Sequence, residues 1–204
     1  ADEDDDVKSP EELVDLYYKS VGRNATLLLN LPPDTRGLIH ANDIESLREF
    51  RSILDETFAE NLAADQTAAA SSVWLNHPKF AAGNVTDRNL RSYWAAAIND
   101  EPDSLTLSFD TPITFDRIML QEPIRLGQRI SSFEVQAQVD GNWQTLADQT
   151  TIGYKRLLRV PLTTTVHVRL IIKAANNTPA ISNFALYRAS PREPSVGATE
   201  NVFE

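Results

Sequence analysis

Residues 133–143 read FEVQAQVDGNW, and this stretch decides the fold class. Apolar and polar residues alternate on the approach to Asp140-Gly141, and a second strand-like segment begins at Asn142-Trp143. A tight turn of the primed types needs positive φ at both central residues, which an Asp-Gly pair supplies readily. The stretch therefore predicts two antiparallel strands joined by a two-residue turn.

Outward from this hairpin, the chain is a series of short strand-like segments separated by turn residues. In residues 165–170 the apolar side chains face one way and His167 and Arg169 face the other, as expected for a half-buried strand. Seven such segments favour a β-sandwich. They are 104–109, 117–122, 132–139, 143–147, 155–160, 165–173 and 181–187.

The first third of the chain has a different pattern. Ser9 to Glu12 form a capping-box signature that begins a helix running to about Gly22, and Asn42 is the expected cap of a second helix that runs towards Leu62. Between them, residues 26–31 form a continuous apolar run typical of a buried parallel strand, with the first helix on its outside. Parallel strands need βα neighbours, and none follows, so we expect the chain to be cut from a larger protein.

The sequence between these two regions, AADQTAAASS at residues 63–72, is small and polar with no sustained periodicity, as in a linker. The expected organisation has four parts. They are the end of a larger domain at 1–62, a linker at 63–72, the sandwich at 73–190 and a tail at 191–204.

Composition excludes several classes of protein. With a net charge of −10 and no basic cluster, the chain is not expected to bind nucleic acid. No apolar run approaches the ~18 residues of a membrane span, and the acidic run at residues 2–6 is interpreted as a solvated segment rather than a metal-binding tail. The 204 residues contain no cysteine, which excludes disulfides but leaves the cellular compartment open.

Two motifs resemble known families. LVDLYYKSVGRNATLLLNLPPDTRGLI at 13–39, followed by DIESLREFRSIL at 43–54, resembles the last strand and helix of the catalytic barrel of glycoside hydrolase family 29, the α-L-fucosidases. FEVQAQVDGNW resembles discoidin-type, galactose-binding-like jelly rolls. The expected fold is therefore mainly β, a jelly-roll β-sandwich preceded by a helix–strand–helix remnant of a (β/α)8 barrel.

The resemblance implies a parent enzyme that is an exo-acting, retaining α-L-fucosidase, acts on fucosylated glycans and is exported to the periplasm or the cell exterior. Retention requires two carboxylates about 5–5.5 Å apart. In the resembled family both lie upstream, so this segment alone is predicted to be inactive, with the upstream barrel of the same polypeptide as its partner. Asn30, at the end of the expected barrel strand, is a candidate for the floor of the fucose pocket. The alternative is that Asn30 fixes the turn at Pro32-Pro33.

A second candidate site resembles the calcium loop of discoidin-type domains. The resemblance implies a possible structural calcium ion, and no cofactor is expected to be required. Calcium takes six to eight oxygen ligands, and one carboxylate with carbonyls and amides is an acceptable set. Arg88 stands where the family pattern has Gly, and the last strand lacks its usual Glu. The alternative is a metal-free loop closed by Asx turns. The implied ligands are Asn84, Asp87, Asn89, Ser92, Ser182 and Asn183.

Two roles for the sandwich remain open. As an independent, calcium-dependent carbohydrate-binding module it needs an exposed aromatic platform, for which Trp74, Trp94 and Trp143 are the candidates. Trp94 and Trp143 are expected in the core or at its edge. As a brace for the barrel, it would use the polar loop 121–129. Its side chains Arg125, Gln128 and Arg129 are then expected to hydrogen-bond the catalytic domain, the alternative being a solvated hairpin.

Overall fold

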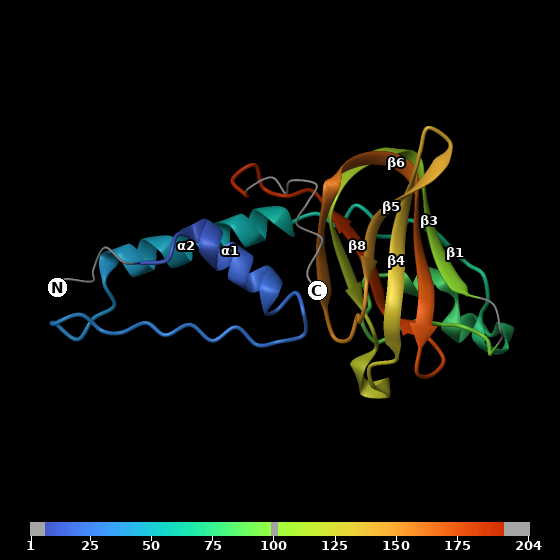
Figure 1. Cartoon of the computed structure of the whole chain (residues 1–204), viewed down its shortest axis with the longest axis horizontal. Coiled ribbons are helices and arrows are strands. Elements are labelled where there is room, and N and C mark those ends of the chain that lie inside the picture. Colours follow the sequence, from blue (N-terminus) through green and yellow to red (C-terminus); the bar gives the residue numbers. More distant parts are fainter. Residues whose placement is uncertain (1–6, 99–101, 194–204) are drawn as a thin grey trace.

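The computed structural model describes residues 7–98 and 102–193, so the acidic run at 2–6 and most of the expected tail lie outside the described residues. Two parts stand side by side (Figure 1). Helices α1 (Pro10–Lys19) and α2 (Ala41–Thr57) form the first part, and an antiparallel β structure forms the second. Neither helix is long and apolar enough to cross a membrane in the described ranges.

The strands form two sheets. A six-stranded sheet wraps around the core, and a small two-stranded sheet stands apart from it in the pairing. The large sheet has the order β1-β3-β6-β4-β5 with β8 also paired to β3, and β2 pairs with β7. Every one of the seven predicted segments overlaps a strand, which confirms the prediction of a mainly β structure. The strands are β1 Thr67–Ala70, β2 Trp94–Ala95, β3 Asp103–Gln121, β4 Ile130–Val139, β5 Asn142–Gln149, β6 Arg156–Ala175, β7 Ala180–Ile181 and β8 Asn183–Tyr187.

Two of these strands are longer than the sequence predicts. Segments 104–109 and 117–122 both fall on β3, and segments 155–160 and 165–173 both fall on β6. The register between the two strands shifts after Ser108 and again after Phe115, where irregularities interrupt the pairing without ending it. The first half of β3 pairs with β1, and its second half with β8, so these long strands connect both layers of the sandwich.

The hairpin between β4 and β5 has the predicted turn. Asp140 has φ 51° and Gly141 has φ 79°, and Val139 faces Asn142 across the pair. Both central residues therefore have the positive φ that the Asp-Gly pair indicates.

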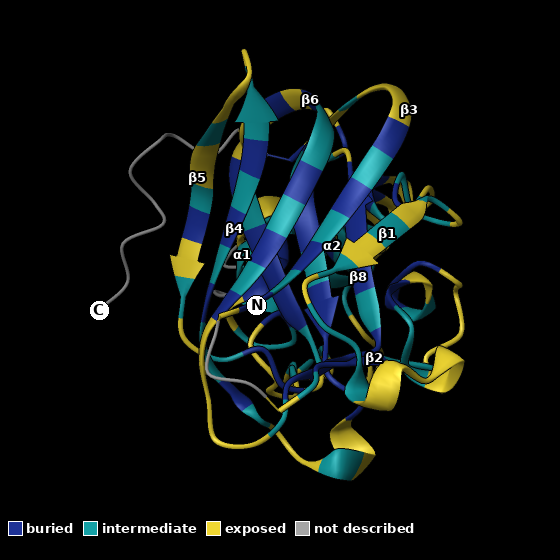
Figure 2. Ribbon diagram, turned by 90° about the vertical axis from the view of Figure 1, so that its right-hand side faces the viewer, coloured by how far each residue is buried: buried dark blue, intermediate teal, exposed yellow. Residues whose placement is uncertain are grey.

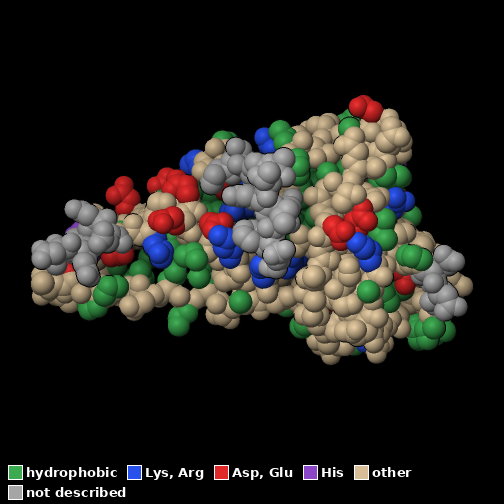
Figure 3. Space-filling model, in the orientation of Figure 1, with side chains coloured by type: hydrophobic (Ala, Val, Ile, Leu, Met, Phe, Trp, Pro, Cys, Tyr) green, Lys and Arg blue, Asp and Glu red, His purple; other side chains and the backbone are tan. Residues whose placement is uncertain are grey.

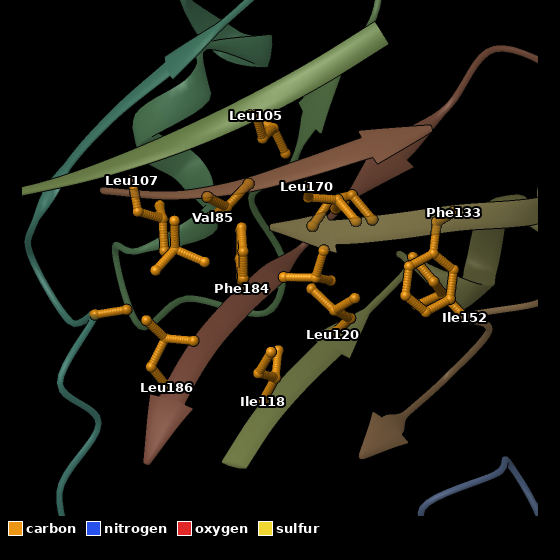
Figure 4. Packing of buried hydrophobic residues seen from close by; sticks show 14 of the residues in the cluster. Val85, Leu105, Leu107, Ile118, Leu120, Phe133, Ile152, Leu170, Phe184 and Leu186 are labelled. Atoms are coloured by element: carbon orange, nitrogen blue, oxygen red, sulfur yellow. The ribbon is translucent and has the colours of Figure 1, made fainter. Parts of the chain in front are cut away.

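A single apolar core fills the sandwich. Along the strands, buried and partly exposed residues alternate (Figure 2), as a half-buried sheet requires. In Figure 4, Phe184 and Leu186 of β8 point towards the side chains of Leu105 and Leu107 on β3. Phe133 and Ile152 extend the same core towards β4.

The helical part begins as predicted and then departs from the prediction. Ser9 caps α1 in a capping box with Glu12, but the helix ends at Lys19 rather than near Gly22. The cap of α2 is His40, whose ring nitrogen accepts a hydrogen bond from the backbone N–H of Asn42, so the prediction of Asn42 as the cap is wrong. This helix ends at Thr57.

Residues 26–31 do not form the predicted buried strand. The chain is extended here, but no strand pairs with it in the described residues, and the side chain of Leu28 is 91% exposed. A parallel strand is stable only between neighbours, and this chain supplies none at that place. The buried face of α1 instead packs on α2 and β6, through a cluster of Val14, Tyr18, Ile53 and Leu157.

The expected linker is also partly structured. Residues 67–70 form β1, which pairs with Leu105 to Ser108 of β3, and Ala63 is buried in the sandwich core. Ala68 and Ala70 of β1 pack against this core, which the composition alone did not indicate.

Candidate functional site

One end of the sandwich gathers the loops that the sequence singled out. We call this the loop end, defined as residues 73–93, 122–129 and 176–182. The pairing of Trp94 with Ile181 and of Ile130 with Ala175 brings these segments to the same end. The loop end is built from four short 3-10 helices, η1 Trp74–Asn76, η2 Pro78–Phe80, η3 Ala82–Val85 and η4 Ile124–Leu126.

The calcium-like loop is closed by its own hydrogen bonds. The Asp87 carboxylate accepts from the backbone N–H of Asn89 at 2.9 Å and from the hydroxyl of Ser92 at 2.5 Å. The side-chain oxygen of Asn89 accepts from the N–H of Arg91 at 3.1 Å. These are the Asx turns of the metal-free alternative.

Asn84 closes the other side of the same loop. Its side-chain amide donates to the carbonyls of Lys79 and Tyr93, at 2.8 and 2.9 Å. Arg88 has φ 61°, a left-handed conformation that favours glycine, and its guanidinium pairs with Asp65 at 2.6 Å outside the loop. The cation thus leaves the loop rather than blocking it.

The last strand contributes differently from the prediction. Ser182 follows Ile181, the partner of Trp94, but its hydroxyl donates to the carbonyl of Gln121. The Asn183 amide donates to the side-chain oxygen of Gln121 at 3.0 Å. The structure therefore brings together Asn84, Asp87, Asn89 and Ser92, while Asn183 is directed at β3. The side chains of the loop are engaged in its own hydrogen bonds, as in the metal-free alternative, and the calcium site stays a prediction.

An aromatic cluster that the sequence reasoning missed lies beside this loop. The ring of Phe80 lies 6.1 Å from that of His77 and 5.5 Å from that of Tyr93, measured between centroids. Two cations border the rings, Lys79 over Phe80 at 5.7 Å and Arg125 over Tyr93 at 5.3 Å. The HPKF sequence is too short for periodicity, so only its aromatic content could have signalled the cluster.

The three tryptophans have other surroundings. Trp94 is fully buried and donates from its indole N–H to the carbonyl of Ser72. Trp143 lies on the sheet face, with the guanidinium of Arg169 at 4.2 Å from its ring. Trp74 is partly exposed in η1. The expectation that Trp94 is a core residue is confirmed.

The polar loop 121–129 is bonded within the sandwich. Arg129 donates to the carbonyls of Leu126 and Thr178, and Arg125 donates to the carbonyl of Arg91 at 2.7 Å. These donors connect the loops of the loop end. Contact of the polar loop with a second domain stays a prediction.

A buried carboxylate, Glu122, holds the base of the same loop. It accepts from the backbone N–H groups of Arg129, Ile130 and Gly153 at 2.8, 3.1 and 2.6 Å. Both oxygens are thus engaged by backbone donors, and a buried charged group needs such partners. This arrangement fixes the base of the loop against β4 and Gly153.

The helices join the sandwich through a buried polar network. Arg117 of β3, which is 2% exposed, donates to the hydroxyl of Tyr18 on α1 and forms an ion pair with Glu193 at 2.9 Å. Glu193 also accepts from the hydroxyl of Thr57 on α2. Burial raises the pKa of Tyr18, so its phenol stays neutral. Lys and Arg side chains gather where the helices meet the sandwich (Figure 3).

The extended segment 26–31 carries the remaining candidate, Asn30. Its side chain is exposed and has no hydrogen bond to any described residue, and its role stays a prediction. Asp34 follows in a tight turn, where its carboxylate accepts from the N–H groups of Arg36 and Leu38. Hydrogen bonding from Arg36 lowers the pKa of Asp34 to about 2, as for a turn-forming carboxylate.

Two plant proteins are similar in sequence to this chain over most of its length. The chain is 40% identical over 185 residues to "Putative alpha-L-fucosidase 1" of Oryza sativa subsp. japonica and 36% identical over 184 residues to "Alpha-L-fucosidase 1" of Arabidopsis thaliana. These matches cover 90% and 88% of this chain but only 36% of each relative, so the chain spans little more than a third of their length.

Among solved structures, that of SpGH29 superposes with a TM-score of 0.86 at 40% identity, over 90% of this chain and 40% of that one. The profile of the F5/8 type C domain matches residues 66–186, which contain β1 to β7 and all of β8 except its last residue, Tyr187. The chain therefore belongs to the F5/8 type C family of discoidin-like domains, and its relatives are alpha-L-fucosidases of glycoside hydrolase family 29.

Proposed function

We propose that this chain is the C-terminal part of an exo-acting, retaining α-L-fucosidase that releases terminal fucose from glycans. In this proposal residues 1–62 complete the catalytic barrel, and the sandwich at 73–190 braces it. The observation that carries the proposal is the 40% identity to SpGH29 over 90% of this chain, which includes the helical part as well as the sandwich. Export from the cell belongs to the same proposal.

The unpaired segment 26–31 supports the barrel assignment. Its extended backbone has no hydrogen-bonded partner strand among the described residues, and Leu28 is 91% exposed. Pairing with a neighbouring barrel strand would satisfy those groups and bury the leucines, at about 25 cal/mol per Å² of apolar surface. Asn30 would then lie at the C-terminal end of a barrel strand, where barrel active sites are assembled.

The bracing role is supported by the way the two parts are joined. Both helices contact the sandwich through buried groups, Tyr18 from α1 and Thr57 from α2, which meet Arg117 and Glu193. A second ion pair, Arg159 with Asp15 at 2.9 Å, connects β6 to α1. The helices are thus held in a fixed position, so a barrel that included them would be held too.

The test compares two proteins, this chain and a longer one that includes the upstream region. The longer protein is expected to hydrolyse an aryl α-L-fucoside, and proton NMR should detect the α-anomer of fucose as the first product. The chain alone is expected to be inactive, because the catalytic carboxylates lie upstream in this proposal. Turnover by the pure chain, or the β-anomer as first product, would contradict it.

A second candidate function is carbohydrate binding at the loop end. The observation that favours it is the cluster of His77, Phe80 and Tyr93, bordered by Lys79 and Arg125. Aromatic faces stack on the apolar faces of sugars, and the adjacent cations donate hydrogen bonds to hydroxyl groups. In this proposal the sandwich directs the enzyme to its glycan substrate.

Calorimetric titration of the chain with fucose and with galactose, in calcium and in EDTA, tests this second function. Phe80→Ala should abolish any binding, whereas Leu162→Ala, at an exposed site on the other end of the sandwich, should not change it. Binding that needs calcium and is lost in Asp87→Ala would support the calcium-dependent form. Binding unchanged in Phe80→Ala would exclude this cluster.

A further inference from the structure

Two arginines lie directly opposite each other where the helical part meets β6. Arg23 and Arg156 form an isolated antiparallel bridge, and the neighbouring N–H of Leu157 donates to the carbonyl of Gly22 at 2.9 Å. Residues opposed in this way project their side chains to the same face. Arg23 is exposed, whereas Arg156 is only 5% exposed.

Arg156 has no carboxylate partner in the described part of the chain. Its one side-chain hydrogen bond runs to the amide oxygen of Gln149, and its buried Nε has no partner. Arg117 and Arg159 differ, because Arg117 pairs with Glu193 and Arg159 with Asp15. Arg169 also has a buried Nε without a partner among the described residues, but its guanidinium lies over the ring of Trp143. Within the described residues, Arg156 is thus a buried cation without a counter-charge.

The surroundings disfavour this charge further. Burial, with a smaller contribution from the nearby charge of Arg23, lowers the pKa of Arg156 to about 10, so the guanidinium is still charged at neutral pH. Like charges opposed across a strand pair destabilise it, and an unpaired buried charge costs more. A chain with a net charge of −10 has ample carboxylates, yet none of those described lies here.

The position is rigid. The side chain of Asn24, next to Arg23, donates to the carbonyl of Ile152 at 2.9 Å and accepts from the N–H of Lys155 at 2.7 Å. These two bonds fix the approach of residue 23 to β6. Guanidinium groups held in place bind carboxylates and phosphates in a bidentate manner.

We propose that Arg23 and Arg156 form an anion site that takes a carboxylate or a phosphate-like oxoanion. The chemistry has two sources, an acidic side chain of a neighbouring domain or a free anion. The anion site itself is independent of the proposed function. Only the binding of an acidic side chain from a neighbouring domain rests on the proposed function. That source is favoured by position, because Arg23 immediately precedes the exposed segment 26–31 that the proposed function assigns to the barrel.

The first experiment measures the melting temperature of this chain in sodium phosphate and in sodium chloride of the same ionic strength. Phosphate at about five times its Kd should raise Tm by about 2–4 °C, since only the folded chain forms the site. Arg156→Gln should abolish the shift. Arg188→Gln removes an exposed arginine paired with Asp116 and should keep the shift, so it controls for general anion effects.

A second variant guards against misfolding of Arg156→Gln. Arg23 is exposed, so Arg23→Gln should fold and should lose most of the phosphate shift. In chloride alone, both variants should melt no lower than the wild type, because each removes an uncompensated charge. No phosphate shift in the wild type, or an equal shift in wild type and Arg23→Gln, would overturn the proposal.

The same measurement on the longer protein distinguishes the two sources. If an acidic side chain of the upstream region fills the site, phosphate should have no effect there and Arg156→Gln should lower Tm. If the ligand is a free anion, the phosphate shift should persist. Failure of the proposed function would appear separately, as a longer protein without fucosidase activity but with an intact shift in this chain.

Discussion

In the sandwich every strand has a hydrogen-bonded neighbour, whereas residues 26–31 between α1 and α2 have none in the described part of the chain. The sandwich has its own core, with side chains such as Phe133 and Phe184 fully buried. The helical part has a small cluster that depends on Leu157 of β6. The difference teaches that the sandwich has a core and strand pairing of its own. The helical part is held by the sandwich, and its residues 26–31 have no partner strand in the described part of the chain.

The largest expected effect breaks the self-contained part. Phe133→Ala should destabilise the chain by about 3–5 kcal/mol, because it leaves a cavity in the core of the sandwich. Urea unfolding measures the loss. Leu28→Ala, at the exposed position of the other part, should change stability by less than about 0.5 kcal/mol. Comparable losses in the two variants would mean that residues 26–31 are buried.

A smaller effect should separate the helices from the sandwich. The Thr57 hydroxyl donates to Glu193 at 2.5 Å and accepts from the N–H of Ser190 at 2.9 Å. Thr57→Val leaves both buried partners unsatisfied, at a cost of about 1–3 kcal/mol. Hydrogen exchange should show lost protection in α2 and unchanged protection in β3 and β6.

Thr164→Val is the matched control, because that hydroxyl bonds only the exposed Thr114. It should leave exchange unchanged in both parts. If Thr57→Val exposed sandwich amides as strongly as those of α2, the two parts would unfold as one unit.

The hairpin tests how locally the sandwich is specified. Gly141 has φ 79°, so Gly141→Ala should cost about 1–2 kcal/mol through steric strain alone, since no atom lies near the added methyl group. Gly83→Ala, at an open position without positive φ, should be close to neutral. Equal melting temperatures for the two variants would contradict the turn assignment.

The smallest effect concerns pH and the contact of α1 with β6. Although burial acts in the opposite direction, hydrogen bonds from Lys19 and Arg159 hold the pKa of Asp15 below its usual 3.8. A depressed carboxyl pKa stabilises the fold above 3.8, and this contribution is lost as pH falls through the folded-state value. Asp15→Asn should therefore flatten the loss of stability below pH ~4 slightly, as followed by thermal melts. A steeper loss in the variant would oppose this account.

The sequence predicts most of what local pattern determines. The capping box at Ser9, the turn at Asp140-Gly141 and all seven strand segments are found in the structure. These features depend on residues that are close in sequence and on the alternation of apolar and polar residues. Neither depends on the rest of the fold. The Asx turn at Asp87, which the sequence analysis gives as the metal-free alternative, is also found.

What the sequence does not predict depends on distant partners. β3 continues through Asp110 to Pro112, where its pairing with β6 is interrupted, and the pairing resumes at Ile113. The run at 26–31 has strand composition but no partner strand here. The ion pair of Arg117 with Glu193 joins residues 76 positions apart, which no local pattern can indicate. The aromatic cluster at the loop end likewise joins η2 to Tyr93 across a loop.

The exposed segment between the helices also determines how the molecule would respond to proteolysis. An extended, solvent-accessible leucine such as Leu28 fits the active-site cleft of a protease that cleaves after large apolar residues. A cut there would separate α1 from α2 in sequence but not in space. Tyr18 would still accept from Arg117, and α2 would remain covalently joined to the sandwich. The two fragments should therefore elute together under native conditions and separate only in denaturant.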